Sequence, residues 1–258
     1  MPIAFDSAPS RRGFLSLLAS AALALPSVLG FAADDLVGRL IRQSGAFPGL
    51  SRRIDFISAA LLGKHYRADT LIGGPATKEK FVVRDDGFDC VTYCEVVLAA
   101  AQAHDLPSFE TQLRTIRYRN GVIAWRERNH DWAAWCERNV AKGRCREISL
   151  GEPVILKKSI GWPSQLGRRD YSIAAIPSAE LLSNKDKLAN GDIIGFVSRQ
   201  PSLDYFHTGF VMFGPAREFL LRHASLSHGE VVNERMVGFL TANRVRYVTL
   251  LRPVEKAA

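Results

Sequence analysis

Apolar residues recur at helical spacing between residues 34 and 62. They form two groups, Leu36, Leu40 and Ile41 and then Ile54, Ile57, Leu61 and Leu62, separated by Phe-Pro-Gly at residues 47–49. Side chains three or four residues apart lie on one face of a helix, and Pro and Gly interrupt helices. The pattern therefore predicts two helices that form an N-terminal helical extension.

A third helix is predicted over residues 88–103. It follows residues 63–87, which are rich in Gly and Pro and indicate an irregular loop. Asp89 suits the N-cap of this helix, because a short acidic side chain can accept the unpaired backbone N–H groups of a first turn. Further helical patterns cover residues 108–117 and 131–140.

The second half of the chain has the pattern of β-strands. Short β-rich runs bounded by Gly, Pro, Asn or Ser cover residues 191–197, 206–213, 218–224 and 246–252. Residues 154–176 fit either an insertion or a strand with a long loop. The predicted fold is α+β, a helical N-terminal half packed on an antiparallel sheet, with residues 34–258 forming a single domain.

The first 33 residues have the composition of an export signal. Arg11 and Arg12 precede an apolar run over residues 15–25, and Ala32 and Ala33 precede an acidic pair. The paired arginines, followed closely by Phe and Leu, resemble a twin-arginine signal. Because the apolar run is shorter than the ~20 residues of a membrane span, removal of residues 1–33 is expected to leave a periplasmic protein with no stable membrane anchor.

Net charge limits the classes of partner that fit the chain, and cysteine content limits its disulfides. The formal net charge of +8 fits an anionic partner such as cell wall, nucleic acid or phospholipid, or serves solubility alone. The arginines are scattered, without zinc-finger spacing or an aromatic ribonucleoprotein motif, so nucleic acid is not expected as a partner. Four cysteines are too few for a disulfide scaffold in a chain of 258 residues.

Cys90 lies in the first turn of the third predicted helix. Unpaired N–H groups and the helix dipole stabilise a thiolate there, which favours a nucleophile. A base and a residue that orients the base complete such a site. His207 and His223 lie on two predicted strands; if these strands are antiparallel neighbours, the imidazoles can face each other beside Cys90.

Each of these residues also has a structural interpretation. A cysteine near a helix start is usually a small buried apolar residue, and a histidine in a strand is more often part of the core. Cys94 shares a helix face with Cys90 but lies a full turn deeper, so it is assigned to the core. A zinc site built from Cys90, Cys94 and two histidines is a rival interpretation that the isolated cysteines do not favour, and no metal or cofactor is predicted.

Several short motifs occur in a fixed order along the chain: Gly63-Lys-His-Tyr66, Phe88-Asp-Cys-Val-Thr92, Gly191-Asp-Ile-Ile-Gly-Phe196, His207-Thr-Gly-Phe-Val211 and His223-Ala-Ser225. Together they resemble the NlpC-type papain-like cell-wall hydrolases. Residues 89–95, 116–121, 128–130 and 203–209, with Trp135, more narrowly resemble the N-acetylmuramoyl-L-alanine amidase-like branch. The likeness covers roughly residues 63–225, and an ordered set of motifs is more specific than any single motif.

The resemblance implies a papain-like α+β fold and a site that cleaves an amide of peptidoglycan or a muropeptide. It assigns Cys90 as nucleophile, His207 as base and His223 as orienting residue, with the backbone N–H of Cys90 among the groups that hold the oxyanion. It also assigns substrate contacts, to Tyr66, Asp89, Arg117, Arg119 and His130. Asp131-Trp132 departs from the aromatic residue that commonly follows Arg-Asn-His in this family, which bears on the contacts to the sugar.

Three activities fit this resemblance. The first is hydrolysis of the bond between N-acetylmuramic acid and L-alanine. The second is cleavage of the stem peptide after D-glutamate by the same fold. The third is a wall-binding protein that has lost catalysis.

The segment from Arg114 to Arg146 is basic and contains Trp125, Trp132 and Trp135. It fits either a wall that stacks on a sugar and pairs with carboxylates, or an amphipathic helix with Trp inward and Arg outward. Cys136 and Cys145 fit either a disulfide or two buried thiols.

Overall fold

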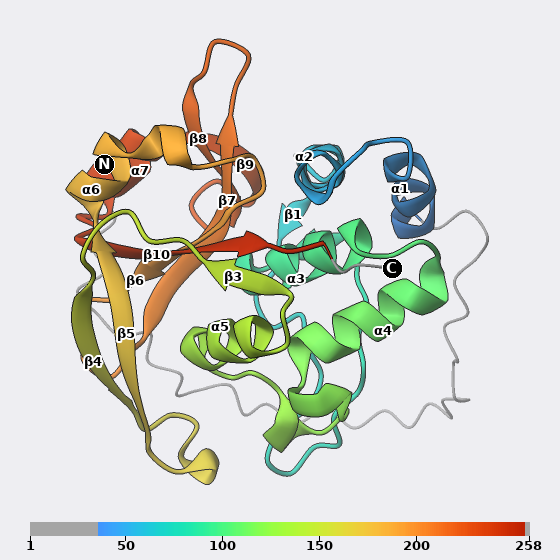
Figure 1. The fold of residues 1–258 in the computed structure, drawn as a ribbon. Helices are drawn as coiled ribbons and strands as arrows, with labels where there is room; N and C mark the ends of the chain where they lie inside the picture. The colour runs from blue at the N-terminus through green and yellow to red at the C-terminus, as the bar shows by residue number, and fades with distance from the viewer. Residues whose placement is uncertain (1–35, 256–258) are drawn as a thin grey trace.

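A mixed α+β fold surrounds one curled, mostly antiparallel sheet (Figure 1). The computed structural model describes residues 36–255, so the predicted signal peptide lies outside the described residues. Within this part of the chain the strand order is β2-β1-β9-β8-β7-β6-β10-β5-β4, and β3 pairs with β10. Of the adjacent pairs, only β1 and β2 are parallel.

The predicted helices of the first half are present. They are α1 (Leu36–Ser44), α2 (Leu50–Ala60), α3 (Cys90–Ala101), α4 (Leu106–Arg117) and α5 (Trp132–Ala141). Helix α4 begins before the predicted Ser108, because Asp105 caps it in a capping box with Ser108 and Pro107 stands in its first turn. The predicted boundary missed this cap.

The strands of the second half are largely as predicted. The runs that were recognised are β6 (Ile193–Val197), β7 (Tyr205–Phe213), β8 (Phe219–Ser225) and β10 (Tyr247–Pro253). Residues 154–176, left open between an insertion and a strand, form a long hairpin of β4 (Val154–Ile160) and β5 (Arg169–Pro177) paired over seven residue pairs.

Several elements were not predicted. They are the strands β3 (Cys145–Glu147) and β9 (Glu230–Arg235), the helices α6 (Ser178–Ser183) and α7 (Met236–Ala242), and the two-residue strands β1 (His65–Tyr66) and β2 (Gly87–Phe88). Because β1 and β2 belong to the first half and extend the sheet beyond β9, the two halves share one sheet rather than forming two separate layers.

Two apolar cores lie on opposite faces of the sheet. Helices α1 to α5 cover one face and contribute most of the larger core, with α3 at its centre. Helices α6 and α7 cover the other face, where Leu181 and Phe239 pack against Phe196 and Val211 from the strands. Among the described helices, none has both the length and the apolar character needed to cross a membrane.

Candidate functional site

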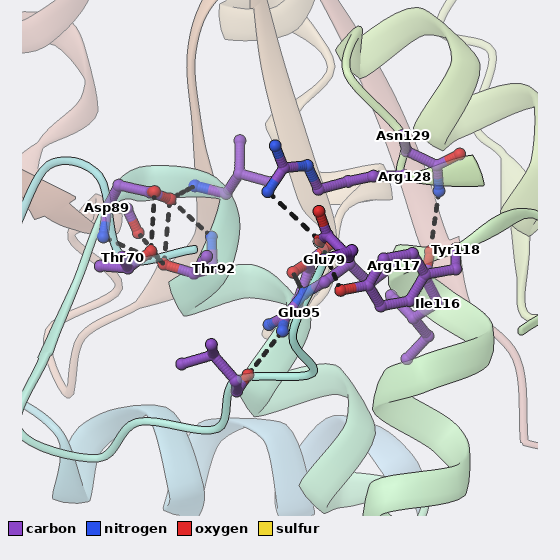
Figure 2. A network of polar contacts seen from close by, with 12 residues as sticks. Thr70, Glu79, Asp89, Thr92, Glu95, Ile116, Arg117, Tyr118, Arg128 and Asn129 are labelled. Atoms are coloured by element: carbon purple, nitrogen blue, oxygen red, sulfur yellow. Dashed lines mark hydrogen bonds and ion pairs between the residues drawn. The ribbon is translucent and has the colours of Figure 1, made fainter. Parts of the chain in front are cut away.

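The N-terminus of α3 is a tightly built turn that begins at Cys90. Asp89 is its N-cap, as predicted: Oδ1 accepts the backbone N–H groups of Val91 at 2.9 Å and Thr92 at 2.7 Å. The Thr92 hydroxyl in turn accepts the N–H of Asp89 at 3.0 Å, and the Thr70 hydroxyl donates to the other carboxylate oxygen at 3.2 Å (Figure 2). This capping box fixes the backbone on which Cys90 sits.

Strand β7 passes directly beside this turn. The backbone N–H of Thr208 lies beside the Cys90 sulfur and lowers the pKa of its thiol, and one turn further along α3 the Cys94 sulfur lies 3.9 Å from the Thr208 hydroxyl. Cys94 is fully buried in the larger core, which confirms its predicted structural place. The residue before Thr208 is His207, so α3 and the strand that carries His207 meet at Cys90.

His207 and His223 are joined by a hydrogen bond. Nε2 of His207 lies 2.6 Å from Nδ1 of His223, and the rings meet edge to face. The neighbouring antiparallel strands β7 and β8 supply the two residues, which confirms the predicted facing of the two imidazoles. Since Nε2 of His207 is occupied, its Nδ1 is the nitrogen left for any other proton transfer.

The His207 ring packs on the face of the sheet that α7 covers. Phe196 stacks on it at 6.0 Å between centroids, and Phe239 of α7 lies 5.4 Å away. Among the described residues, the structure has no hydrogen bond between the Cys90 sulfur and either imidazole; Cys90 reaches the strand through the Thr208 backbone instead. Helix α3 and the strand that carries His207 are therefore in contact, but the His207 ring lies on the face of the sheet covered by α7 and not beside Cys90 as predicted.

Burial sets the protonation of the site. It raises the pKa of the Cys90 thiol to about 12, with a further rise from the Asp89 carboxylate, against lowering by nearby backbone N–H groups. It also lowers the pKa of His207 well below the usual 6.5, with His223 lowering it further. The low thiol pKa expected from the helix terminus alone is wrong for this state, because burial and Asp89 outweigh the N–H groups. The site rests as a neutral thiol and a neutral imidazole.

Tyr66, which the resemblance assigned as a substrate contact, lies close to the thiol. Burial raises the pKa of its phenol to about 12, and repulsion from the Asp89 carboxylate and from Cys90 when it is ionised adds to the rise. Strand β1 carries Tyr66 and pairs with β2, which immediately precedes Asp89 and Cys90. A phenol with a raised pKa keeps its proton at neutral pH and remains a hydrogen-bond donor.

Arg117 was predicted to contact the substrate, but the structure buries its side chain. Its side chain is only 2% exposed, and Nε donates to Glu95 of α3 at 2.7 Å while Nη1 donates to the Val82 carbonyl at 2.6 Å (Figure 2). A buried guanidinium whose donors are used internally holds the loop before Cys90 against α3 and α4 rather than facing a ligand.

Glu79 extends this buried network. Its Oε1 accepts the Tyr118 hydroxyl at 2.8 Å and Nη1 of Arg128 at 3.3 Å, as Figure 2 shows. The Arg-Asn-His motif therefore uses its arginine to fasten the loop, and Asn129 donates to the Ile116 carbonyl at 2.9 Å.

The other predicted contacts have local partners. Arg119 is half exposed, and its Nη2 donates to Glu127 at 2.6 Å. His130 is part-buried, with Nε2 2.6 Å from the Trp125 carbonyl and burial lowering its pKa. The next residue, Asp131, accepts from Arg169 at 2.5 Å and from Tyr171 at 2.8 Å, which ties α5 to β5. Substrate contact by Arg119 and His130 stays a prediction.

The tryptophans of the basic segment point inward. Trp125, Trp132 and Trp135 are buried, and Trp132 stacks on Trp135 at 4.3 Å. This agrees with the amphipathic alternative and argues against a sugar-binding wall. Cys136 and Cys145 are free thiols.

Two residues at the site were not predicted. Thr208 lies against Cys94 through its hydroxyl and beside Cys90 through its backbone N–H, and Glu234 places Oε2 3.3 Å from Nε2 of His223. The sequence offered a weak indication of Thr208 within the His207 motif, and none of Glu234, whose strand was not recognised. Among the described residues no group of three His, Cys, Asp or Glu side chains is arranged to hold a metal.

The fold and the comparison of the sequence with known families place the chain in an amidase-like class. The sequence model of the family described as N-acetylmuramoyl-L-alanine amidase-like matches residues 56–245, and the chain belongs to this family. No curated protein matches the sequence.

Solved structures share the fold. A Legionella pneumophila protein has a TM-score of 0.75 at 23% identity, covering 86% of this chain and 96% of its own. An N-acetylmuramoyl-L-alanine amidase from Bacteroides uniformis has a TM-score of 0.66 at 25% identity, covering 77% of this chain and 97% of its own. The fold is thus shared over most of the length of each protein.

Proposed function

We propose that this protein is a papain-like cysteine amidase that hydrolyses the bond between N-acetylmuramic acid and L-alanine in peptidoglycan or its fragments. The observation that carries the proposal is the hydrogen bond between His207 on β7 and His223 on β8, where the residue after His207, Thr208, lies beside the Cys90 sulfur. Membership of the amidase-like family supports the choice of bond.

The proposed reaction begins from the neutral pair. As the Cys90 sulfur attacks the lactyl carbonyl carbon, its proton passes to Nδ1 of His207 and a C–S bond forms. The imidazolium then gives this proton to the nitrogen of L-alanine, the C–N bond breaks and the peptide leaves. Water next attacks the thioester, passing a proton through His207 to the departing thiolate and releasing the muramoyl carboxylate.

Two donors are proposed for the oxyanion that forms during the attack. One is the backbone N–H of Cys90, which lies in the first turn of α3, where N–H groups have no partner within the helix. The other is the Tyr66 hydroxyl, which stays protonated beside the thiol because its pKa is raised. Donors fixed before the reaction stabilise the developing charge without reorganisation.

We propose that the protein acts in the periplasm after export by the twin-arginine route. The amidase-like family acts on a substrate outside the cytoplasm, and residues 11–33 have the composition of such a signal. The net charge of +8 suits an anionic wall.

Digestion of defined muropeptides tests the proposal. Wild type is expected to release the intact stem peptide and a sugar with a free lactyl carboxylate, and Cys90→Ala is expected to abolish release. Cys94→Ala is the matched control, because it removes a thiol one turn along the same helix and should keep most of the activity.

Three outcomes contradict the proposal. A shortened stem peptide indicates cleavage after D-glutamate instead. Full activity of Cys90→Ala contradicts the cysteine mechanism. A folded wild type that binds the wall but hydrolyses nothing contradicts it as well.

A further inference from the structure

A carboxylate lies on the far side of His223 from His207. His223 is 1% exposed, and its Nε2 is completely buried. Oε2 of Glu234 on β9 lies 3.3 Å from this nitrogen, within ion-pair distance, and among the described residues no hydrogen bond of good geometry reaches the nitrogen. Strands β7, β8 and β9 therefore present His207, His223 and Glu234 in a row across one face of the sheet.

We propose that Glu234 is a positioning residue that fixes the tautomers of both imidazoles and stabilises the charge that forms on His207. This inference rests on the proposed function, since it takes Nδ1 of His207 as the proton acceptor. Glu234 would act through His223 and would not touch the substrate.

The hydrogen-bond directions follow from proton counting. A neutral imidazole carries one N–H, so a His207 that accepts a proton at Nδ1 must carry its own proton on Nε2. That N–H donates to Nδ1 of His223 across the 2.6 Å contact. His223 must then carry its proton on Nε2, which points toward the Glu234 carboxylate, an acceptor with no donors of its own.

The charges near the pair favour this direction. Glu234 raises the pKa of His223 against the larger lowering by burial, and a charged His228 in the turn between β8 and β9 would lower it. Phe239 of α7 contacts both rings. The side chain of Glu234 is 25% exposed and has no Arg or Lys partner among the described ion pairs, so its charge is directed at His223.

This arrangement has an energetic consequence. When His207 takes the thiol proton, a positive charge forms in a buried apolar setting, where an unpaired charge is costly. The Glu234 carboxylate lowers that cost through the intervening N–H of His223. Because the N···O separation of 3.3 Å is long for a hydrogen bond, it is expected to shorten as the charge develops.

Two variants separate charge from shape. Glu234→Gln keeps the size and removes the charge; kcat should fall on the order of tenfold or more with little change in KM, since general-base catalysis contributes ~10²–10⁴-fold and the carboxylate supplies part of it. The acidic limb of the kcat profile should also move to lower pH, because loss of the negative charge lowers the pKa of the imidazole pair. Glu234→Asp should restore the limb and part of the rate.

The matched control is Glu230→Gln, which removes an exposed carboxylate from the same face of β9 and should leave both readouts unchanged. Equal kcat and an unmoved acidic limb in Glu234→Gln would overturn the proposal. So would an equal loss in the Gln and Asp variants without movement of the limb, because that result indicates a structural role only.

A measurement independent of activity separates this inference from the proposed function. Nitrogen-15 spectra of the histidine rings should show the Nε2–H tautomer for both His207 and His223 in wild type and in Cys90→Ala. An Nδ1–H tautomer at His223 contradicts the inference even if Cys90 is essential. If both histidines show the predicted tautomers but Cys90→Ala is fully active, the role of Glu234 stands and the cysteine mechanism is rejected.

Discussion

Arg117 and Arg119 stand two residues apart and lie in opposite environments. Arg117 is buried with Glu95, whereas the side chain of Arg119 is 52% exposed beside Glu127. Sequence alone gave both the same role, because charge and motif membership do not reveal which side of a helix end faces the core. The free energy of unfolding lost when each side chain is removed depends on whether a buried partner is left without its ion pair.

Arg117→Ala is expected to lower the free energy of unfolding by ~3–5 kcal/mol, because it leaves the Glu95 carboxylate buried without its partner. Arg119→Ala is the control and should cost no more than ~1 kcal/mol, since its ion pair is exposed. Urea unfolding followed by circular dichroism measures both. Equal losses in the two variants would contradict the structural role of Arg117.

Tyr66 permits a test of the proposed oxyanion donor. Tyr66→Phe keeps the ring and removes the hydroxyl beside the thiol, so kcat is expected to fall by ~10²–10³-fold, the usual cost of losing one such donor. Stability should change little, which thermal unfolding would verify. Unchanged turnover would assign the second donor to another group.

At the scale of elements, the N-terminus of α3 combines two opposing influences of Asp89. The carboxylate orders the first turn through Val91 and Thr92, and its charge raises the pKa of Cys90. Asp89 therefore stabilises the first turn of α3 and disfavours the thiolate form of Cys90. An amide at this position can separate the two influences, because Asn caps helices about as well as Asp.

Asp89→Asn is expected to keep the helix start and lower the pKa of the Cys90 thiol, because the neighbouring negative charge is gone. Alkylation of Cys90 by iodoacetamide at neutral pH should therefore become faster. Asp89→Ala should cost ~1 kcal/mol of unfolding free energy through loss of the cap. Slower alkylation in the Asn variant, with the fold intact, would contradict the assigned effect of the charge.

Elements defined by their own periodicity or caps were predictable, and elements defined by pairing were not. Helix α3 begins with an Asp cap, and β7 is an apolar run with β-branched and aromatic residues. Strand β9 has two adjacent apolar residues among six and no alternation of polar and apolar positions, and α7 is short and has no side-chain cap. Both elements gain their structure from neighbours distant in sequence, which periodicity does not record.

The same limit applies inside the site. The register of β6 against β7 shifts between Phe196 and Val197, which pair with His207 and Tyr205, so Phe206 is an extra residue on β7. A bulge of this kind changes which side chains share a face, and a sequence does not reveal it. The order Cys, His, His could be predicted, but the packing of His207 toward α7 and its link to Glu234 could not.

At the scale of the whole molecule, the buried histidines couple stability to pH. Burial lowers the pKa of His207, His223 and His130 in the folded state. Below about 6.5 the unfolded chain takes up protons that the folded chain resists, so the unfolded state binds more protons there. The free energy of unfolding should therefore decrease as pH falls below that value.

Urea unfolding at about pH 7.5 and about pH 5.5 should show this decrease, and His223→Gln should reduce the difference between the two pH values. His104→Gln is the control, because that side chain is 83% exposed and should leave the difference as in wild type. Equal stability of wild type at both values would contradict the burial of neutral imidazoles.

The parallel pair of β1 and β2 has a consequence for how such proteins can diversify. The chain leaves the sheet after Tyr66 and returns at Gly87, so both ends of the excursion are clamped side by side within reach of Cys90. Within this segment, residues 74–77 form a turn closed by hydrogen bonds between Gly74 and Thr77. This turn can be lengthened, shortened or replaced without moving the Cys90 sulfur, because the β1–β2 pair fixes both ends of the segment. The reacting atom then stays in place while the residues of the turn vary.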